Sequence, residues 1–374
     1  MEILYISNSI IPSKNANSIN VMKMCQAFAD NNFKVTLLAP NKKAKIEKKI
    51  KDSFKFYGVK KNFFIKKLWY PDIKGGVLIY AISIFIFLLF NRKYKIVYGR
   101  FLHGCFFASL LGNQVIFESH MPENIKKNFR NFFFKHLLKS KSFLKLVVIS
   151  NSLKKNYLKK KYISKKKIIV AHDGADETKN FNIKAKLLGK KKNLKVGYVG
   201  HLYKGKGMEI ISLLANKINQ GIEYHVIGGL SKDINLWKRK IKSKKVFFYG
   251  HISHKHITKY LNALDVCLLP NQKVVFASGA KENAVNISPF TSPLKLFEYM
   301  SHRKAIIASD LNILREILNK KNSILVEYNN VNKWIKAINK LKIRSVRENL
   351  AKQALNDFRQ YSWKNRVKRI ISLI

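Results

Sequence analysis

Short apolar runs alternate with helix-compatible segments along nearly the whole chain, and this rhythm constrains the fold more than any other feature. Residues 2–7 and 34–39 are apolar runs that end in turn residues, and residues 18–29 between them have helical periodicity. A strand, a helix and a second strand in this order predict a βαβ unit with a parallel sheet. The same pattern predicts further strands at residues 96–98, 115–117 and 146–149.

A second series of strands follows a polar, basic segment at residues 180–192. A chain of 374 residues is too long for one comfortable core and suits two domains. We therefore expect an α/β protein with a doubly wound domain at residues 1–187, a second at 188–355 and a C-terminal helix at 356–374 that could pack on either domain. The second series of strands is expected at residues 194–200, 224–227, 246–249, 266–270, 305–308 and 323–326.

Two segments raise the question of a membrane. Residues 77–90 are fourteen mostly apolar residues, which is short of the ~20 that a helix needs to cross a bilayer. A buried core helix is the favoured interpretation, and an interfacial membrane contact is the alternative. Residues 125–145 predict a basic amphipathic helix, which either covers the core or lies on anionic headgroups through Lys126, Lys127 and Arg130.

The charge balance indicates an anionic partner. The chain has 73 Lys and Arg against 21 Asp and Glu, and a net charge of +52 attracts polyanions or anionic membrane surfaces. Nucleic acid is the weaker hypothesis, because the charge is spread through both halves and no RNA- or DNA-binding motif occurs. Cys25, Cys105 and Cys267 are odd in number and far apart, which supports neither a disulfide framework nor a zinc site. With no leader-like N-terminus, a cytoplasmic protein is expected.

Residues 288–300 have the features of an anion site. Ser292 is a good N-cap and Pro293 suits the first helical position, so a helix is expected to begin there. The free backbone N–H groups from Thr291 to Leu294 would then face an anion such as phosphate. Glu298 follows among apolar residues, and is either a ligand-binding carboxylate or a surface residue paired with Lys295.

Two turns that follow predicted strands complete the set of possible site residues. Ligands of doubly wound domains bind at the carboxyl ends of the strands. The turn at residues 200–207 is rich in glycine and contains Lys206, so it is either a phosphate-binding loop or a flexible basic turn. His120, in the sequence Glu118-Ser119-His120, could donate to a sugar hydroxyl or to developing charge.

Together these residues resemble the retaining glycosyltransferases of family 4, part of the glycosyl transferases group 1. The resemblance covers nearly the whole chain. It implies the GT-B fold, in which two Rossmann-like domains face each other across a cleft and the C-terminal helix can cross back to the first. It rests on residues 292–300 followed by 305–310, on 200–207, on 171–176 and on 361–363.

The resemblance also implies roles for individual residues. His120 and Lys206 match the catalytic positions, the lysine neutralising the donor diphosphate and the histidine contacting the transferred sugar. Glu298 matches the carboxylate that holds the ribose. The remaining matches are His201, Thr291, Ser292 and Leu294 at the diphosphate, Ile252 near the base, and Phe290 and Thr291 at the donor sugar.

Two departures from the family pattern bear on the donor. Phe290 stands where the family has a sugar-contacting Glu, so the donor sugar stays open, and His201 stands where an Arg is frequent. The expected activity is metal-independent, cofactor-free, retaining transfer from a nucleotide sugar to a glycan or lipid-linked acceptor of the cell envelope. We expect it at the inner face of the membrane. A sugar-nucleotide epimerase of the same fold is the alternative.

Overall fold

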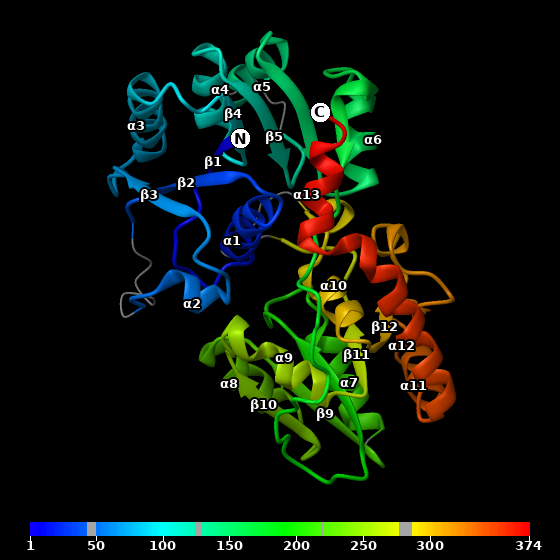
Figure 1. The fold of residues 1–374 in the computed structure, drawn as a ribbon. Helices are drawn as coiled ribbons and strands as arrows, with labels where there is room; N and C mark the ends of the chain where they lie inside the picture. The colour runs from blue at the N-terminus through cyan, green and yellow to red at the C-terminus, as the bar shows by residue number, and fades with distance from the viewer. Residues whose placement is uncertain (43–49, 124–128, 219, 277–285) are drawn as a thin grey trace. The chain divides into compact units, whose positions relative to one another are not determined.

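The computed structural model describes residues 1–42, 50–123, 129–218, 220–276 and 286–374. It divides into two compact units, one formed by Met1–Asp173 together with Trp363–Ile374 and the other by Gly174–Ser362. Figure 1 follows the chain through both units.

The first unit is built on a seven-stranded parallel sheet in the order β3-β2-β1-β4-β5-β6-β7. Its central strands are buried on both faces, which explains why they read as continuous apolar runs. The strands are β1 Glu2–Ile6, β2 Lys34–Pro40, β3 Phe64–Leu68, β4 Ile96–Gly99, β5 Gln114–Ser119, β6 Phe143–Val148 and β7 Ile168–Val170. The helices are α1 Ala16–Ala29, α2 Ser53–Tyr57, α3 Gly76–Phe90, α4 Leu102–Leu110, α5 Phe129–Lys139, α6 Asn151–Lys159 and the C-terminal α13 Trp363–Ile371.

The second unit has a six-stranded parallel sheet in the order β10-β9-β8-β11-β12-β13. The strand order reverses beside β8, where doubly wound sheets bind their ligands. The strands are β8 Leu194–Val199, β9 Ile222–Ile227, β10 Val246–Gly250, β11 Val266–Leu269, β12 Ala305–Ser309 and β13 Ile324–Val326. The helices are α7 Met208–Lys217, α8 Ser231–Lys240, α9 His254–Ala263, α10 Leu294–Ser301, α11 Val331–Lys340 and α12 Arg344–Phe358.

The structure places the first domain boundary between Asp173 and Gly174, not at the predicted 187/188. The segment that follows Gly174 is polar, but its backbone is bound to the second unit. The Ala185 amide donates to the Lys259 carbonyl at 2.8 Å, and the Asn262 side chain donates to the carbonyls of Asn180 and Ile183. Hydrogen bonds of the backbone do not require apolar side chains, so they leave no trace in the composition of this segment. Its polar composition therefore predicted a linker.

The second predicted boundary, at 355/356, falls inside α12. This helix stays with the second unit, where Ala354 and Phe358 are part of its core. The chain crosses back only with α13, which packs on α1 of the first unit (Figure 1). The C-terminal helix therefore returns to the first domain, as the resemblance implied, but it begins at Trp363.

α3 differs from the predicted buried core helix. Tyr80, Ala81, Ile84 and Leu88 are buried, whereas the opposite face of the same helix is apolar and exposed to solvent. Because residues 77–90 are apolar on every face of the helix, the sequence did not indicate which face is buried and which is exposed. No helix in the described part of the chain is long and apolar enough to span a membrane.

The predicted amphipathic helix at 125–145 ends earlier than expected. The structure describes it as helix over Phe129–Lys139, and β6 starts at Phe143. Lys126 and Lys127 lie outside the described residues. Arg130 is engaged within the protein, since its guanidinium donates to both carboxylate oxygens of the buried Glu123 at 2.6 and 2.7 Å. Its predicted contact with lipid headgroups therefore competes with an internal ion pair.

Candidate active site

The loop between β8 and α7 holds Lys206 close to the end of β11. Gly207 makes this possible, because its φ is +93° and a Cβ there would lie 2.2 Å from the Pro270 carbonyl oxygen. Only glycine tolerates both the backbone angle and the close approach. Burial lowers the pKa of Lys206 to about 8.

Lys295, in the first turn of α10, is the second cation of this region. Its Nζ donates to the Tyr198 hydroxyl at 2.8 Å and lies 4.0 Å from the centre of that ring. Burial, followed by the charge of Lys206, lowers the pKa of Lys295 well below its ordinary value. Among the described residues neither Lys206 nor Lys295 forms an ion pair. The charge of Glu298 raises the pKa of Lys295 but does not outweigh these two effects. Half-buried cations whose charge is not fully compensated are unfavourable, so the two lysines favour an anionic ligand.

His201 belongs to the same cluster. Burial lowers the pKa of His201, and the charges of Lys206 and Lys295 lower it further. The imidazole is therefore neutral at pH 7 and serves as a hydrogen-bonding group, not as the cation that an arginine would supply. His201, Lys206 and Lys295 are hereafter called the cationic cluster.

The start of α10 differs from the prediction by one residue. Helix α10 begins at Leu294, and Pro293 occupies the N-cap position with φ −70° and ψ 119° and no side-chain cap. Ser292 is buried but does not cap the helix. The amides of Leu294 and Lys295 lie in the first turn, where helical N–H groups have no intrahelical acceptor. A helix therefore begins here, one residue later than predicted, and its binding of an anion stays a prediction.

The residues ahead of α10 are placed as follows. Phe290 ends a short 3-10 helix, Ser288–Phe290, and is half-buried. The hydroxyl of Thr291 donates to the Ser288 carbonyl at 3.5 Å, a long hydrogen bond. The contact of Phe290 and Thr291 with a donor sugar stays a prediction, because residues 277–285, which precede this segment, lie outside the described residues.

Glu298, one turn along α10 from Lys295, is held by a histidine that the sequence analysis did not name. The carboxylate accepts from Nε2 of His254, the first residue of α9, at 3.0 Å. Both side chains retain about a fifth of their exposure or less, at 16% for Glu298 and 21% for His254. Ile252 lies two residues before His254 and packs against the core of the second unit. The carboxylate is therefore oriented but still reachable.

The first unit has a buried ion-pair network at the end of β5. Glu118 is 1% exposed, and its carboxylate accepts from Tyr98, His120 and Arg366, the last at 3.1 Å. Burial alone would raise the pKa of Glu118, but the charge of Arg366 and the hydrogen bond from His120 hold it well below its usual range. Glu118 is a permanent anion here, and both of its oxygens are engaged.

Arg366 connects this network to the C-terminal helix α13. Besides Glu118 it donates to the carbonyls of His172 and Ala171, at 2.8 and 3.1 Å. These carbonyls follow β7 at the end of the first unit, so one guanidinium joins α13 to β5 and to the chain after β7. We call Glu118, Tyr98, His120 and Arg366 the anchored network.

His120 has a defined tautomer in this network. Its Nε2 faces the anionic Glu118 and must carry the hydrogen, which leaves Nδ1 as an acceptor. Burial and the charge of Arg100 lower the pKa of His120, so the ring is neutral at pH 7. Glu118, His120 and Asp173 offer ligand atoms within 4.8 Å of one another, but the Glu118 oxygens are already bonded to Tyr98, His120 and Arg366. The geometry is that of an ion-pair network.

Sequence reasoning missed Arg366, Tyr98 and His254 as parts of these sites. A signal for Arg366 existed, because it shares one helical face with the buried Trp363, Val367 and Ile370. An arginine on the apolar stripe of a helix requires a buried partner. No comparable signal marks Tyr98 or His254, whose roles depend on which strands and helices become neighbours.

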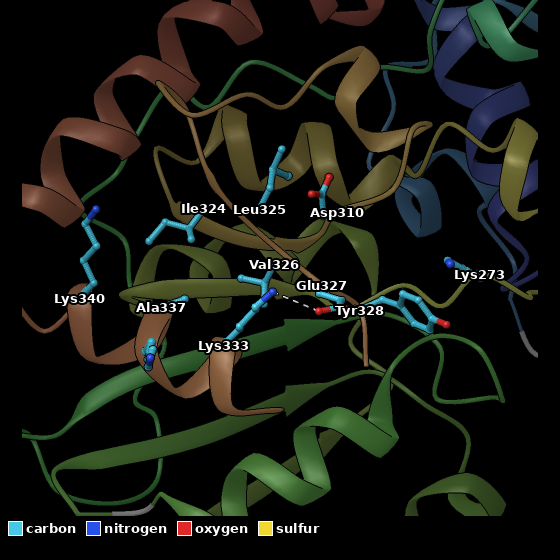
Figure 2. Close-up of a pocket in the computed structure, with 11 residues that line it drawn as sticks. Lys273, Asp310, Ile324, Leu325, Val326, Glu327, Tyr328, Lys333, Ala337 and Lys340 are labelled. Atoms are coloured by element: carbon cyan, nitrogen blue, oxygen red, sulfur yellow. Dashed lines mark hydrogen bonds and ion pairs between the residues drawn. The ribbon is translucent and has the colours of Figure 1, made fainter. Parts of the chain in front are cut away.

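A cavity of about 600 Å³ lies elsewhere in the second unit, between β13 and α11 (Figure 2). Its lining includes Lys273, Asp310, Tyr328 and Lys336, and a Glu327–Lys333 ion pair of 3.2 Å spans part of it. None of the predicted site residues lines it. Its lysines, Lys273 and those of α11, are exposed, whereas Lys206 and Lys295 of the cationic cluster are half-buried.

Residues 193–342 match the family model described as "Glycosyl transferases group 1". This segment contains the cationic cluster and Glu298. The matched segment lies within the second unit, which is therefore similar to this family. No curated protein sequence matches the chain significantly.

Solved structures resemble the chain over its full length. A sucrose-phosphate synthase from Thermosynechococcus elongatus has a TM-score of 0.73 at 15% identity, with 100% of this chain and 98% of that one covered. HepE from Anabaena, solved with UDP and glucose, has a TM-score of 0.72 at 13% identity, with both chains fully covered. The lipopolysaccharide outer core galactosyltransferase WaaB reaches 0.66 at 16%, also with full coverage of both. At these identities the likeness concerns the fold, and it confirms the predicted α/β, GT-B architecture.

Proposed function

We propose that the protein is a retaining glycosyltransferase that moves a sugar from a nucleotide-sugar donor to an acceptor hydroxyl. The cationic cluster supports this proposal most directly. Lys206 and Lys295 are half-buried, form no ion pair among the described residues and lie in the segment that matches the glycosyl transferases group 1. A donor diphosphate would supply the missing negative charge.

The cluster would act mainly on the leaving group. When the bond between sugar and phosphate breaks, negative charge grows on the diphosphate and positive charge on the sugar ring. Two preorganised lysines and the amides at the start of α10 would stabilise that growing charge without further reorganisation. Positive charge supplied in this way makes metal-independent transfer our proposal, with no cofactor beyond the donor.

The remaining residues would orient the donor and the transferred sugar. Glu298, held by His254, would accept hydrogen bonds from the ribose hydroxyls. His120, with Nδ1 unprotonated, would accept a hydrogen bond from a hydroxyl of the transferred sugar. The acceptor hydroxyl would enter on the face of the departing diphosphate, whose oxygen could take its proton. This geometry retains the configuration at the anomeric carbon.

Structural neighbours guide the choice of substrates to test. HepE has been solved with UDP, with UDP and glucose, and with UDP-glucose, so a uridine diphosphate hexose is the first donor to try. WaaB is named for the lipopolysaccharide outer core. We propose a lipid-linked or envelope glycan as acceptor, reached from the cytoplasmic face of the membrane, with no role for nucleic acid.

The experiment is a screen of sugar nucleotides by thermal shift, because a ligand of the folded state raises its stability. The donor identified in this way is then incubated with and without glycan acceptors, and nucleotide release is measured for wild type, Lys206→Ala and Glu298→Ala. We expect acceptor-dependent release that both substitutions abolish. Release in buffer alone with a free sugar epimer would instead indicate an epimerase. Unchanged release by both variants would refute the assigned site.

A further inference from the structure

Helix α3 has two apolar faces, and only one of them is covered. The buried face consists of Tyr80, Ile84 and Leu88, spaced by four residues. The opposite face, also spaced by four, exposes Leu78 at 38%, Ile82 at 49%, Ile86 at 49% and Phe90 at 82%. An ordinary surface helix carries polar side chains on its outer face. α3 has no charged residue at all.

The exposed apolar surface continues into the segment before α3. Trp69 is 66% exposed and Ile73 is 63% exposed. The Trp69 carbonyl accepts from the Ser83 hydroxyl of α3 at 3.3 Å, so this segment lies against the helix. We define the α3 face as Leu78, Ile82, Ile86 and Phe90 together with Trp69 and Ile73. A tryptophan beside an aliphatic surface is the composition found at membrane interfaces.

One exposed acid, Asp72, borders the α3 face, and it forms an ion pair with Lys42 at 2.6 Å. Residues 73–172 hold twenty lysines and arginines but only two acidic residues, Glu118 and Glu123. Both are buried, at 1% and 5% exposure. Lys74 and Arg92 are exposed at the two ends of α3. This charge distribution would repel a second copy of the same surface and attract an anionic one.

We propose that the α3 face docks on the surface of a bilayer that contains anionic lipids. Helix α3 is a fifteen-residue element, too short to span the hydrocarbon core at ~20 residues, so it would lie in the interface with Ile82, Ile86 and Phe90 directed into it. Lysines and arginines around it would contact the headgroups. The inference stands on α3 and its surroundings, independent of the transfer reaction. It also replaces the segment 125–145 as the main lipid contact.

The test is cosedimentation of the full chain with phosphatidylcholine vesicles that contain or lack phosphatidylglycerol. The variant combines Ile82→Gln, Ile86→Gln and Phe90→Gln, all at exposed positions. We expect wild type to bind only the anionic vesicles, less strongly at high salt. The triple variant should bind on the order of 100-fold more weakly, because three apolar side chains no longer enter the interface.

A matched control replaces three exposed apolar residues of the second unit, with Leu188→Gln, Leu236→Gln and Ile343→Gln. This control should bind vesicles as wild type does. Equal binding by the α3 variant and wild type, or no binding of wild type to anionic vesicles, would overturn the proposal. A dimer in solution that the α3 variant alone dissociates would also overturn it, since the face would then be covered by a second copy. Unaltered thermal unfolding shows that each variant is folded.

Discussion

The two units treat buried charge in opposite ways. In the anchored network of the first unit, Glu118 and Arg366 are buried at 1% and 3% exposure and neutralise each other at 3.1 Å. In the cationic cluster of the second unit, burial lowers the pKa of Lys206 and of Lys295, the charge of Lys206 lowers that of Lys295 further, and neither lysine forms an ion pair among the described residues. The charges of the first site are compensated within the fold, whereas we propose that a ligand compensates those of the second.

This difference predicts that one set of charged residues contributes to stability and the other to ligand binding. Removing one member of a compensated buried pair leaves an unpaired charge and destabilises the fold. Removing one cation from a cluster of like charges relieves repulsion and harms only ligand binding. A substitution in the anchored network should therefore mainly lower the free energy of unfolding, whereas a substitution in the cationic cluster should mainly lower activity.

The largest effect is expected for Arg366→Met. Glu118 would be left buried without its counter-charge, and the free energy of unfolding should fall by about 3–5 kcal/mol. Urea denaturation followed by circular dichroism measures this change. Arg369→Met, at an exposed position of the same helix, is the control and should change stability little. Equal losses in the two variants would show that Arg366 does not stabilise the network.

Lys206→Met should reduce activity without reducing stability. Without a lysine aimed at the leaving diphosphate, kcat/KM for glycosyl transfer should fall by about 100- to 1,000-fold. The free energy of unfolding should stay the same or rise, because a half-buried cation that forms no ion pair among the described residues has been removed. Lys204→Met, at an exposed position of the same loop, should retain activity. A strongly destabilised Lys206→Met would contradict the comparison.

The two units should also differ in how pH affects them. The pKa of Lys206 is about 8 in the folded chain and near 10.5 when unfolded, so the unfolded state binds more protons between these values. Lys206 therefore makes the ligand-free protein more stable as pH rises from about 8 to 10.5. A bound diphosphate favours the protonated lysine, and nucleotide binding near pH 9 should take up a proton.

Calorimetric titration with UDP in buffers of different ionisation enthalpy measures this uptake. Lys206→Met should lose most of the uptake, whereas an anchored-network variant such as Tyr98→Phe should keep it. Proton uptake that is the same in Lys206→Met and wild type would assign the linkage to another group.

The smallest effect is expected for His254→Ala. Glu298 would lose one hydrogen bond of 3.0 Å that orients its carboxylate. Nucleotide affinity should then fall by roughly fivefold, corresponding to about 1 kcal/mol. His256→Ala, two residues further along α9 and exposed, is the control. If both variants bind nucleotide equally well, the His254 contact does not orient the carboxylate for binding.

The sequence predicted the buried parallel strands well, because strands covered on both faces must be apolar throughout. β3 was missed since its sequence, Phe64–Leu68, mixes lysines with apolar residues at the sheet edge. β7 was missed because only three apolar residues follow a lysine run. The segment 180–192 was interpreted as a linker because its attachment to the second unit depends on hydrogen bonds of the backbone, which leave little trace in composition.

The residues of the candidate site also differ in whether the sequence alone indicates them. Lys206, Glu298 and His120 could be found from the sequence, because each lies in a turn or helix start whose local chemistry is unusual. Tyr98, His254 and Arg366 act through contacts between distant elements, and only the fold brings these together. The exposed face of α3 was equally hidden, since a uniformly apolar run does not reveal which side is covered.

The return of α13 to the first unit affects the order in which the protein can mature. During synthesis the residues of the first unit up to Asp173 leave the ribosome early, followed by the whole of the second unit. Arg366 emerges after both, so Glu118 lacks this counter-charge until the second unit has been synthesised. The first unit can reach its final stability only when α13 is present, and a nascent chain that stops before α13 would keep a carboxylate without its arginine in the core.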